Sequence, residues 1–117
     1  MLLPSILVFG RDPLLLETRR LVLEQAGFHV LSVADSAGVE KIVLAQPISL
    51  LVLCHSITDE ERESVLKSAH SRRPDMKNIV LTTGTSVSRP GKNYEFVNAY
   101  DGPRSLISTV ERLLKNA

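Results

Sequence analysis

Five short, mainly apolar runs alternate with amphipathic segments along this 117-residue chain, and that alternation limits the folds open to it more than any other feature. The runs are Ser5–Phe9, Phe28–Val33, Leu50–Leu53, Lys77–Thr82 and Tyr94–Asn98. Leu50–Leu53 is apolar on both faces, as a central strand of a parallel sheet requires. Because crossovers between parallel strands are right-handed, this order predicts one doubly wound α/β domain of the (βα)5 type over residues 1–117.

The first helix is predicted from Asp12 and Pro13, a carboxylate cap followed by proline at the first helical position. It should extend to about Ala26. The residues expected to face the sheet share helical spacing and are Leu14, Leu15, Thr18, Leu21 and Val22. Leu16 and Leu23 then lie on a flank as spare apolar surface, so this helix is a candidate for contact with a protein partner.

The other helices are predicted mainly from their first residues. Asp35 or Ser36 caps the second helix, and Pro103 begins the last one. Thr58 and Glu61 form a capping box, in which Thr58 accepts a hydrogen bond from the amide of Glu61 and the Glu61 carboxylate reaches back. The caps at Asp35 or Ser36 and at Thr58 predict one helix before the third strand and one after it.

The segment Gly84–Asn93 is a poor helix former, although the pattern places the fourth helix there. It holds two glycines, two serines and Pro90, and glycine and proline cost a helix about 1 and 3 kcal/mol each. The fourth helix is therefore predicted to be short or degraded.

Composition excludes several classes of function. A formal charge of +1 provides no overall field to attract nucleic acid or anionic lipid. No run approaches the roughly 20 apolar residues of a membrane span, and the first residues do not resemble a signal peptide. A single cysteine excludes an internal disulfide and fits a reducing, cytoplasmic setting. No helix-turn-helix pattern or added effector domain is present, so DNA binding by this chain alone is not expected.

The ends of the strands are the candidate functional positions, because ligands bind at the carboxyl edge of such sheets. The polar and small residues that follow the strands are Gly10, Arg11, Asp12, Cys54, His55, Thr82, Thr83, Asn98 and Ala99. Asp12 is their only carboxylate, and they contain no evident nucleophile and base pair. The sequence therefore does not predict an enzyme, a metal site or a cofactor.

With Val8–Pro13, Leu51–Cys54 and Val80–Thr82 at its strand ends, the chain resembles the receiver domain of bacterial response regulators over essentially its whole length. The resemblance implies a flavodoxin-like, CheY-like three-layer sandwich with strand order 2-1-3-4-5. It also implies a place in two-component phosphorelay signalling. In that family, acidic residues after the first strand hold Mg²⁺, and an aspartate after the third accepts phosphate. A hydroxyl after the fourth strand, and an aromatic residue and a lysine at the fifth, complete the switch.

The family's functional residues are largely replaced here. Its acidic positions correspond to Gly10, Arg11 and Asp12, and its phosphoacceptor aspartate corresponds to Cys54. The hydroxyl position corresponds to Thr82, the aromatic position to Phe96 and the lysine position to Ala99. Mg²⁺ requires oxygen ligands, which Gly10 lacks, and the charge of Arg11 repels it. A thiol at Cys54 cannot form an acyl phosphate. The resemblance therefore implies a degenerate receiver, a pseudo-receiver, that acts through protein–protein contact, with homodimerisation left open.

A second interpretation is a small-molecule or redox sensor that uses Arg11, Cys54 and Thr82. The Arg11 cation would lower the pKa of the Cys54 thiol, whereas the simpler alternative is a cysteine that fills a site as a small apolar side chain. Arg11 itself could pair with Asp12, bind an anion beside Thr82, or remain exposed. Cys54 and His55 are adjacent, so they are expected to point to opposite faces and not to share a metal.

Overall fold

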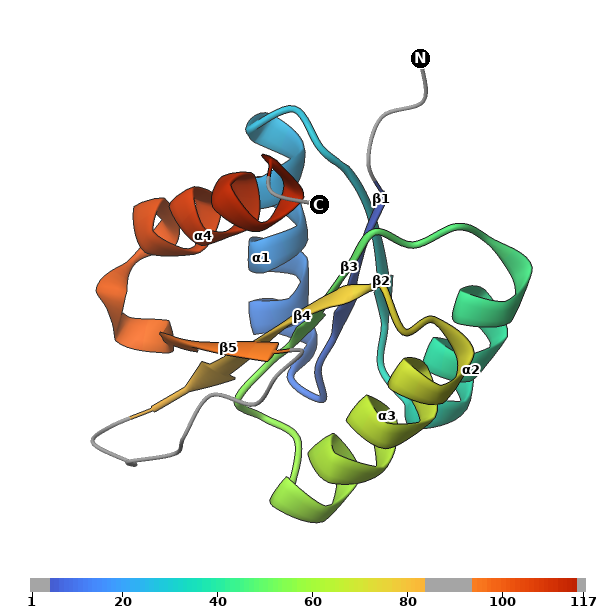
Figure 1. Ribbon diagram of the computed structural model, residues 1–117. Helices are drawn as coiled ribbons and strands as arrows, with labels where there is room; N and C mark the ends of the chain where they lie inside the picture. The colour runs from blue at the N-terminus through green and yellow to red at the C-terminus, as the bar shows by residue number, and fades with distance from the viewer. Residues whose placement is uncertain (1–4, 84–93, 116–117) are drawn as a thin grey trace.

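Five parallel strands form one sheet in the order β2-β1-β3-β4-β5, as the sequence predicts (Figure 1). The computed structural model describes residues 5–83 and 94–115. The strands are β1 Ser5–Phe9, β2 His29–Val33, β3 Leu50–Leu53, β4 Lys77–Thr82 and β5 Tyr94–Asn98. All four residues of β3 are buried, which fits its central place between β1 and β4.

The helices cover both faces of the sheet, so the domain is a three-layer sandwich (Figure 1). The described residues form α1 Pro13–Gln25, α2 Ser36–Ala45, α3 Asp59–Arg72 and α4 Pro103–Lys115, with a short 3-10 turn, η1, at Ala99–Asp101. The core between the sheet, α1 and α4 contains Leu23 and Val110, and the core on the α2 and α3 side contains Val43 and Val65. The predicted short fourth helix at 84–93 lies outside the described residues.

Three helices begin at the predicted caps. Asp12 Oδ1 accepts hydrogen bonds from the amides of Leu14, at 3.0 Å, and Leu15, at 3.3 Å. Asp35, not Ser36, caps α2. Thr58 caps α3 by accepting from the amide of Glu61 at 3.1 Å. Each cap satisfies amides that the first turn leaves without a partner, so the helix starts can be read from local sequence.

The predicted buried face of α1 is wrong in part: Leu15 and Val22 are half-buried, but the fully buried residues are others. Leu16 and Leu23 are buried in the core, whereas Leu14 is 76% exposed and Leu21 is 44% exposed. Arg19 lies between the two buried leucines on the same side of the helix and is itself partly buried. An arginine can cover a core with its aliphatic stem, but a count of apolar residues does not register it. The count therefore favoured the adjacent face of the helix, which carries Leu14 and Leu21.

The strand register brings the candidate residues to one edge. Phe9 pairs with Leu53, so Gly10 and Cys54 leave the sheet side by side. The amide of Cys54 donates to the carbonyl of Phe9 at 2.8 Å, which extends this pairing by one residue. Among the described residues, no helix combines the length and apolar character needed to cross a lipid bilayer.

Candidate functional site

Gly10 and Cys54 are in close contact at the ends of β1 and β3. A Cβ atom added to Gly10 would lie 3.0 Å from Cys54 Cβ and 3.1 Å from Cys54 Sγ. Both residues are buried, and Cys54 is only 2% exposed. The position therefore has no room for the acidic side chain that the resemblance would place at Gly10 while Cys54 occupies the neighbouring strand end.

Gly10→Ala is expected to lower the free energy of unfolding by about 1–3 kcal/mol, because the added methyl group overpacks the contact with Cys54. Urea unfolding of both proteins measures the loss. The cost should be smaller when Cys54 is first replaced by glycine, which removes both close atoms. An equal cost in the two backgrounds would show that the contact with Cys54 is not the cause.

Arg11 forms an ion pair with Glu61 of α3, fifty positions away in the sequence. Its Nε donates to Glu61 Oε1 at 3.1 Å, Nη2 donates to Oε2, and Nη1 donates to the carbonyl of Ala34 at 3.0 Å. Its guanidinium carbon also lies 5.8 Å from the centre of the Phe9 ring. Hydrogen bonding to Glu61 raises the pKa of Arg11 above its already high usual value.

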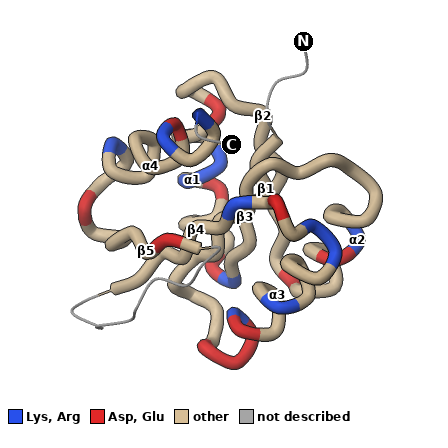
Figure 2. The backbone as a smooth tube through the Cα atoms, in the orientation of Figure 1, with Lys and Arg blue, Asp and Glu red and all other residues tan. Residues whose placement is uncertain are grey.

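This ion pair decides one alternative that the sequence left open, since Arg11 is exposed but paired, and it corrects one prediction. Arg11 does not pair with Asp12, and the Glu61 carboxylate does not return to the cap at Thr58. Acidic residues gather in the first turn of α3 (Figure 2), and one of them, Glu61, pairs with Arg11. The opposite charges of the two loops favour the observed pairing, which local capping rules do not consider.

The side chains of Asp12 and Ser56 both form hydrogen bonds with backbone amides at the loop after β1. The Asp12 carboxylate caps α1, while Ser56 Oγ accepts from the amide of Arg11 at 2.9 Å and from that of Asp12 at 3.4 Å. Ser56 had no signal in the sequence beyond its position two residues after Cys54. The one carboxylate expected at the strand ends is therefore a structural cap. Within the described residues, no three histidine, cysteine or acidic side chains are arranged to hold a metal ion.

Cys54 and His55 both approach Arg19, a residue of α1 that the sequence did not single out. Arg19 Nη2 lies 3.4 Å from His55 Nδ1, and Arg19 is also close enough to the Cys54 thiol to act on its pKa. The expectation that Cys54 and His55 point to opposite faces is wrong, because the alternation continues only to Cys54 and the chain turns at His55. The buried position of Arg19 could be found only by choosing the correct phase of α1.

The Cys54 thiol is strongly biased toward its protonated form. Burial raises its pKa to about 11, and the opposing effect of the nearby Arg19 charge and hydrogen bond is smaller. Arg11, which the sequence suggested as the activating cation, is not a cause of the shift. Cys54 thus has the character of a buried apolar residue and not of a reactive thiolate.

The pH dependence of stability should include a contribution from His55. Burial, and then the charge of Arg19, lower its pKa below the usual value, while Asp12 partly opposes this. The unfolded state therefore binds the proton more readily, so stability is lost as the pH falls below about 6.5. In urea unfolding at pH 7.5 to 5, His55→Gln should show a shallower loss than the wild type. Equal slopes would contradict this assignment.

The remaining predicted residues lie on β4 and β5 or directly after them. Thr82 pairs in register with Asn98, Thr83 is exposed, and Ala99 begins η1 and packs against the α1 and α4 core. Phe96 packs edge-on against Tyr94, with ring centres 5.4 Å apart. Among the described residues, no hydrogen bond joins Thr82 to Arg11 or Cys54. Thr82 is therefore not linked by a direct hydrogen bond to the other two residues of the expected sensor site.

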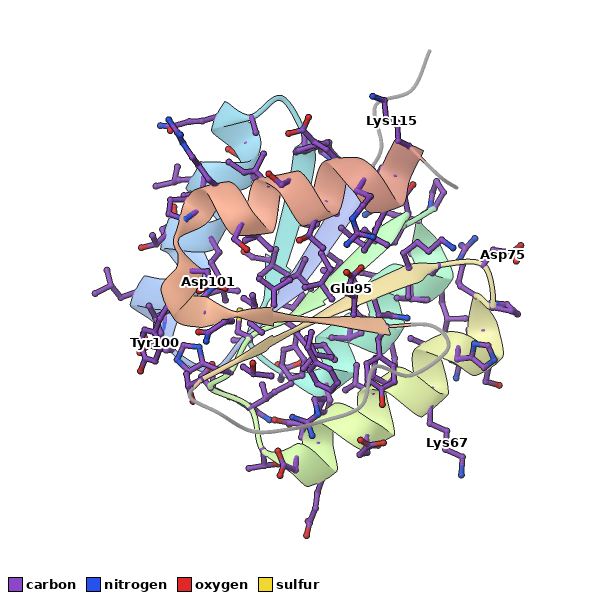
Figure 3. The ribbon with its side chains drawn as sticks, turned by 60° about the vertical axis from the view of Figure 1, so that its left-hand side comes forward. Lys67, Asp75, Glu95, Tyr100, Asp101 and Lys115 are labelled. Carbon is purple, nitrogen blue, oxygen red and sulfur yellow. The ribbon has the colours of Figure 1, made fainter. Side chains whose placement is uncertain are left out.

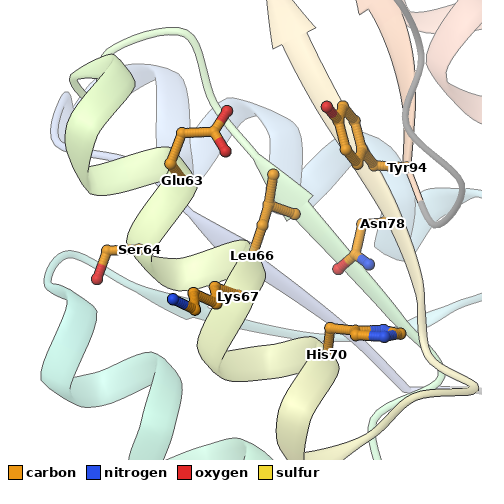
Figure 4. A pocket seen from close by; sticks show the side chains of 7 residues that line it. All are labelled: Glu63, Ser64, Leu66, Lys67, His70, Asn78 and Tyr94. Carbon is orange, nitrogen blue, oxygen red and sulfur yellow. The ribbon is translucent and has the colours of Figure 1, made fainter.

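A separate pocket of about 420 Å³ opens between α3 and the sheet (Figure 4). Its lining residues are Glu63, Ser64, Leu66, Lys67, His70, Asn78 and Tyr94. Asn78 and Tyr94 pair at the beginnings of β4 and β5, so this pocket lies far along the strands from the carboxyl edge. The sequence did not predict it.

No family model matches the sequence, and no curated protein is significantly similar to it. Solved structures do match. A response regulator receiver domain protein from Clostridium thermocellum has a TM-score of 0.85 at 17% identity, covering 97% of this chain and 96% of that chain. A receiver protein from Sinorhizobium medicae has a TM-score of 0.84 at 19% identity, with 97% and 95% covered.

A CheY-like receiver domain protein from Methanospirillum hungatei shares more sequence, at 25% identity, with a TM-score of 0.79 and 97% and 96% of the two chains covered. The matches span nearly all of this chain and share its sheet order and helical layers. The chain therefore has the flavodoxin-like, CheY-like fold of response regulator receiver domains.

Proposed function

We propose that this protein is a cytoplasmic, bacterial pseudo-receiver: a single receiver-like domain of two-component signalling that acts by binding another protein and not by accepting phosphate. The observation that carries the proposal is the Arg11–Glu61 ion pair at the end of β1. It puts a guanidinium where the resemblance would place the acidic residues for Mg²⁺. A fixed cation there opposes the binding of a second cation.

The phosphoacceptor position supports the same proposal. Cys54 is almost fully buried, its thiol is protonated at neutral pH, and Gly10 packs directly against it. Phosphoryl transfer to a receiver needs an exposed carboxylate and a metal that neutralises the phosphoryl oxygens. Neither enzymatic activity nor a cofactor is part of the proposed function.

The test is direct. Acetyl phosphate or beryllofluoride is added with Mg²⁺, and the amide signals of Thr82 and Phe96 are followed by NMR. A receiver domain with an intact aspartate serves as the positive control in the same buffers. We expect no specific shifts in this protein. Shifts that saturate at millimolar Mg²⁺, or a stable phosphoryl adduct in mass spectra, would overturn the proposal.

The partner-binding surface we propose is the outer face of α1, with exposed leucines at Leu14 and Leu21 in place of the buried Leu16 and Leu23. Tyr100, 77% exposed, projects from η1 after β5 (Figure 3).

Pull-downs should lose the partner with Leu14→Glu and keep it with Leu44→Glu, a matched exposed leucine on α2. Equal retention by both variants would exclude the α1 face. DNA and membranes are not proposed as partners. Sedimentation of the same variants measures whether the protein forms a homodimer through this face.

The alternative, a redox or small-molecule sensor built from Arg11, Cys54 and Thr82, has less support. Arg11 is engaged by Glu61, and the pKa of Cys54, about 11, lies above that of an ordinary free thiol, about 8.5. Neither residue offers the anion-binding or nucleophilic group that this function requires.

A further inference from the structure

A cavity of about 200 Å³ lies between α1, the ends of β4 and β5, and the beginning of α4. Most of its wall is apolar, and the side chains that form it include Leu15, Val22, Leu81, Val97 and Leu106. Arg19 contributes the charged group of the wall. The cavity is distinct from the edge formed by Arg11, Ser56 and Glu61.

Arg19 lacks a carboxylate partner among the described residues. Its Nη1 atom is buried without a hydrogen bond, and its Nη2 atom contacts the His55 ring at 3.4 Å. The adjacent Arg20 differs, because it is paired with both Glu17 and Glu24. A buried guanidinium hydrogen without an acceptor is costly, and burial strengthens its attraction to an anion.

The start of α4 adds to this preference for negative charge. Gly102 and Pro103 border the cavity, and Pro103 is the first residue of a helix of 13 residues. The free amides and dipole at a helix N-terminus favour anions. Arg19 and this helix end therefore both border the same small, apolar space.

We propose that this cavity binds a small carboxylate with a compact aromatic or branched apolar body. The carboxylate would accept a hydrogen bond from Arg19, which lines the cavity, while the apolar body contacts Val97 and Leu106. A cavity of roughly 150 Å³ accommodates benzene, so the volume here suits benzoate or a short branched acid. This inference goes beyond the proposed function, because it assigns the domain a chemical input beside β5.

The test uses the whole chain and NMR titration of its amides with benzoate and with isovalerate, at constant ionic strength. We expect saturable shifts at Thr18, Leu81 and Ala99, which line the cavity, with a Kd of about 1 mM or tighter for at least one acid. Benzamide, the neutral analogue of benzoate, should bind at least tenfold more weakly.

Three variants separate the cavity from general salt effects. Arg19→Met keeps the aliphatic stem and should weaken binding at least tenfold, whereas Arg20→Met, the matched control, should leave it unchanged. Ala99→Leu fills the cavity and should abolish binding; it decides the matter if Arg19→Met does not fold. The proposal is overturned if neither acid gives saturable shifts below 20 mM, if Arg19→Met binds as the wild type does, or if Ala99→Leu retains binding.

Discussion

Leu23→Ala is expected to lower the free energy of unfolding by about 3 kcal/mol or more, and Leu21→Ala, two positions earlier on the same helix, by less than about 0.5 kcal/mol. The reason is burial: Leu23 is 0% exposed in the α1 and α4 core, and Leu21 is 44% exposed. Truncating a buried leucine loses its transfer free energy and leaves a cavity, whereas truncating an exposed one does neither. Urea unfolding measures both variants at equal protein concentration.

The same comparison can be repeated two turns earlier with Leu16→Ala and Leu14→Ala. Leu16 is 9% exposed and Leu14 is 76% exposed, so the order of effects should again follow burial. Helix propensity cannot produce this result, because all four substitutions exchange leucine for alanine in one helix. If Leu21 and Leu14 proved the costlier positions, α1 would pack on the face that the apolar count first indicated, and the placement of Arg19 would be wrong as well.

The Cys54 thiol is expected to react with a disulfide reagent at pH 8 at least about 100-fold more slowly in the folded protein than in the guanidinium-unfolded chain. A pKa of about 11 leaves far fewer thiolates at pH 8 than a free thiol has. The deficit is roughly 200-fold against a free pKa of about 8.5, and the greater nucleophilicity of a high-pKa thiolate recovers only part of it. Burial of all but 2% of the residue adds a steric barrier.

The control for this measurement is Arg19→Met. It removes the charge and hydrogen bond that lower the pKa of Cys54, so the folded variant should react no faster than the wild type. Rapid labelling of the native wild-type thiol would contradict the assignment of Cys54 as a core residue and would restore the redox-sensor interpretation.

Much of the fold could be predicted because its signals are local or statistical. Asp12, Asp35 and Thr58 satisfy amides within three residues of themselves, so short patterns identify these helix starts. The apolar run Leu50–Leu53 similarly predicts a strand buried on both faces. The phase of α1 could not be predicted in this way, because Arg19 interrupts the apolar stripe between Leu16 and Leu23 and only packing against the sheet and α4 decides which side is buried.

The candidate site was predictable as a set of positions but not as a set of interactions. The strand ends correctly located Gly10, Arg11 and Cys54 at one edge of the sheet. The partner of Arg11 was missed because Glu61 is distant in sequence and already had an explanation as part of a capping box. A capping rule weighs only neighbouring residues, whereas the ion pair depends on how two loops meet.

By itself, the sequence determined the order of strands and helices, the helix caps and the loss of acidic residues from the strand ends, since each follows from residue type and spacing. Only the tertiary structure decided which face of α1 is buried, which carboxylate Arg11 binds, and that Cys54 and His55 meet Arg19 beside an apolar cavity. These outcomes depend on contacts between segments far apart in the chain, where burial and long-range charge pairing override local preference.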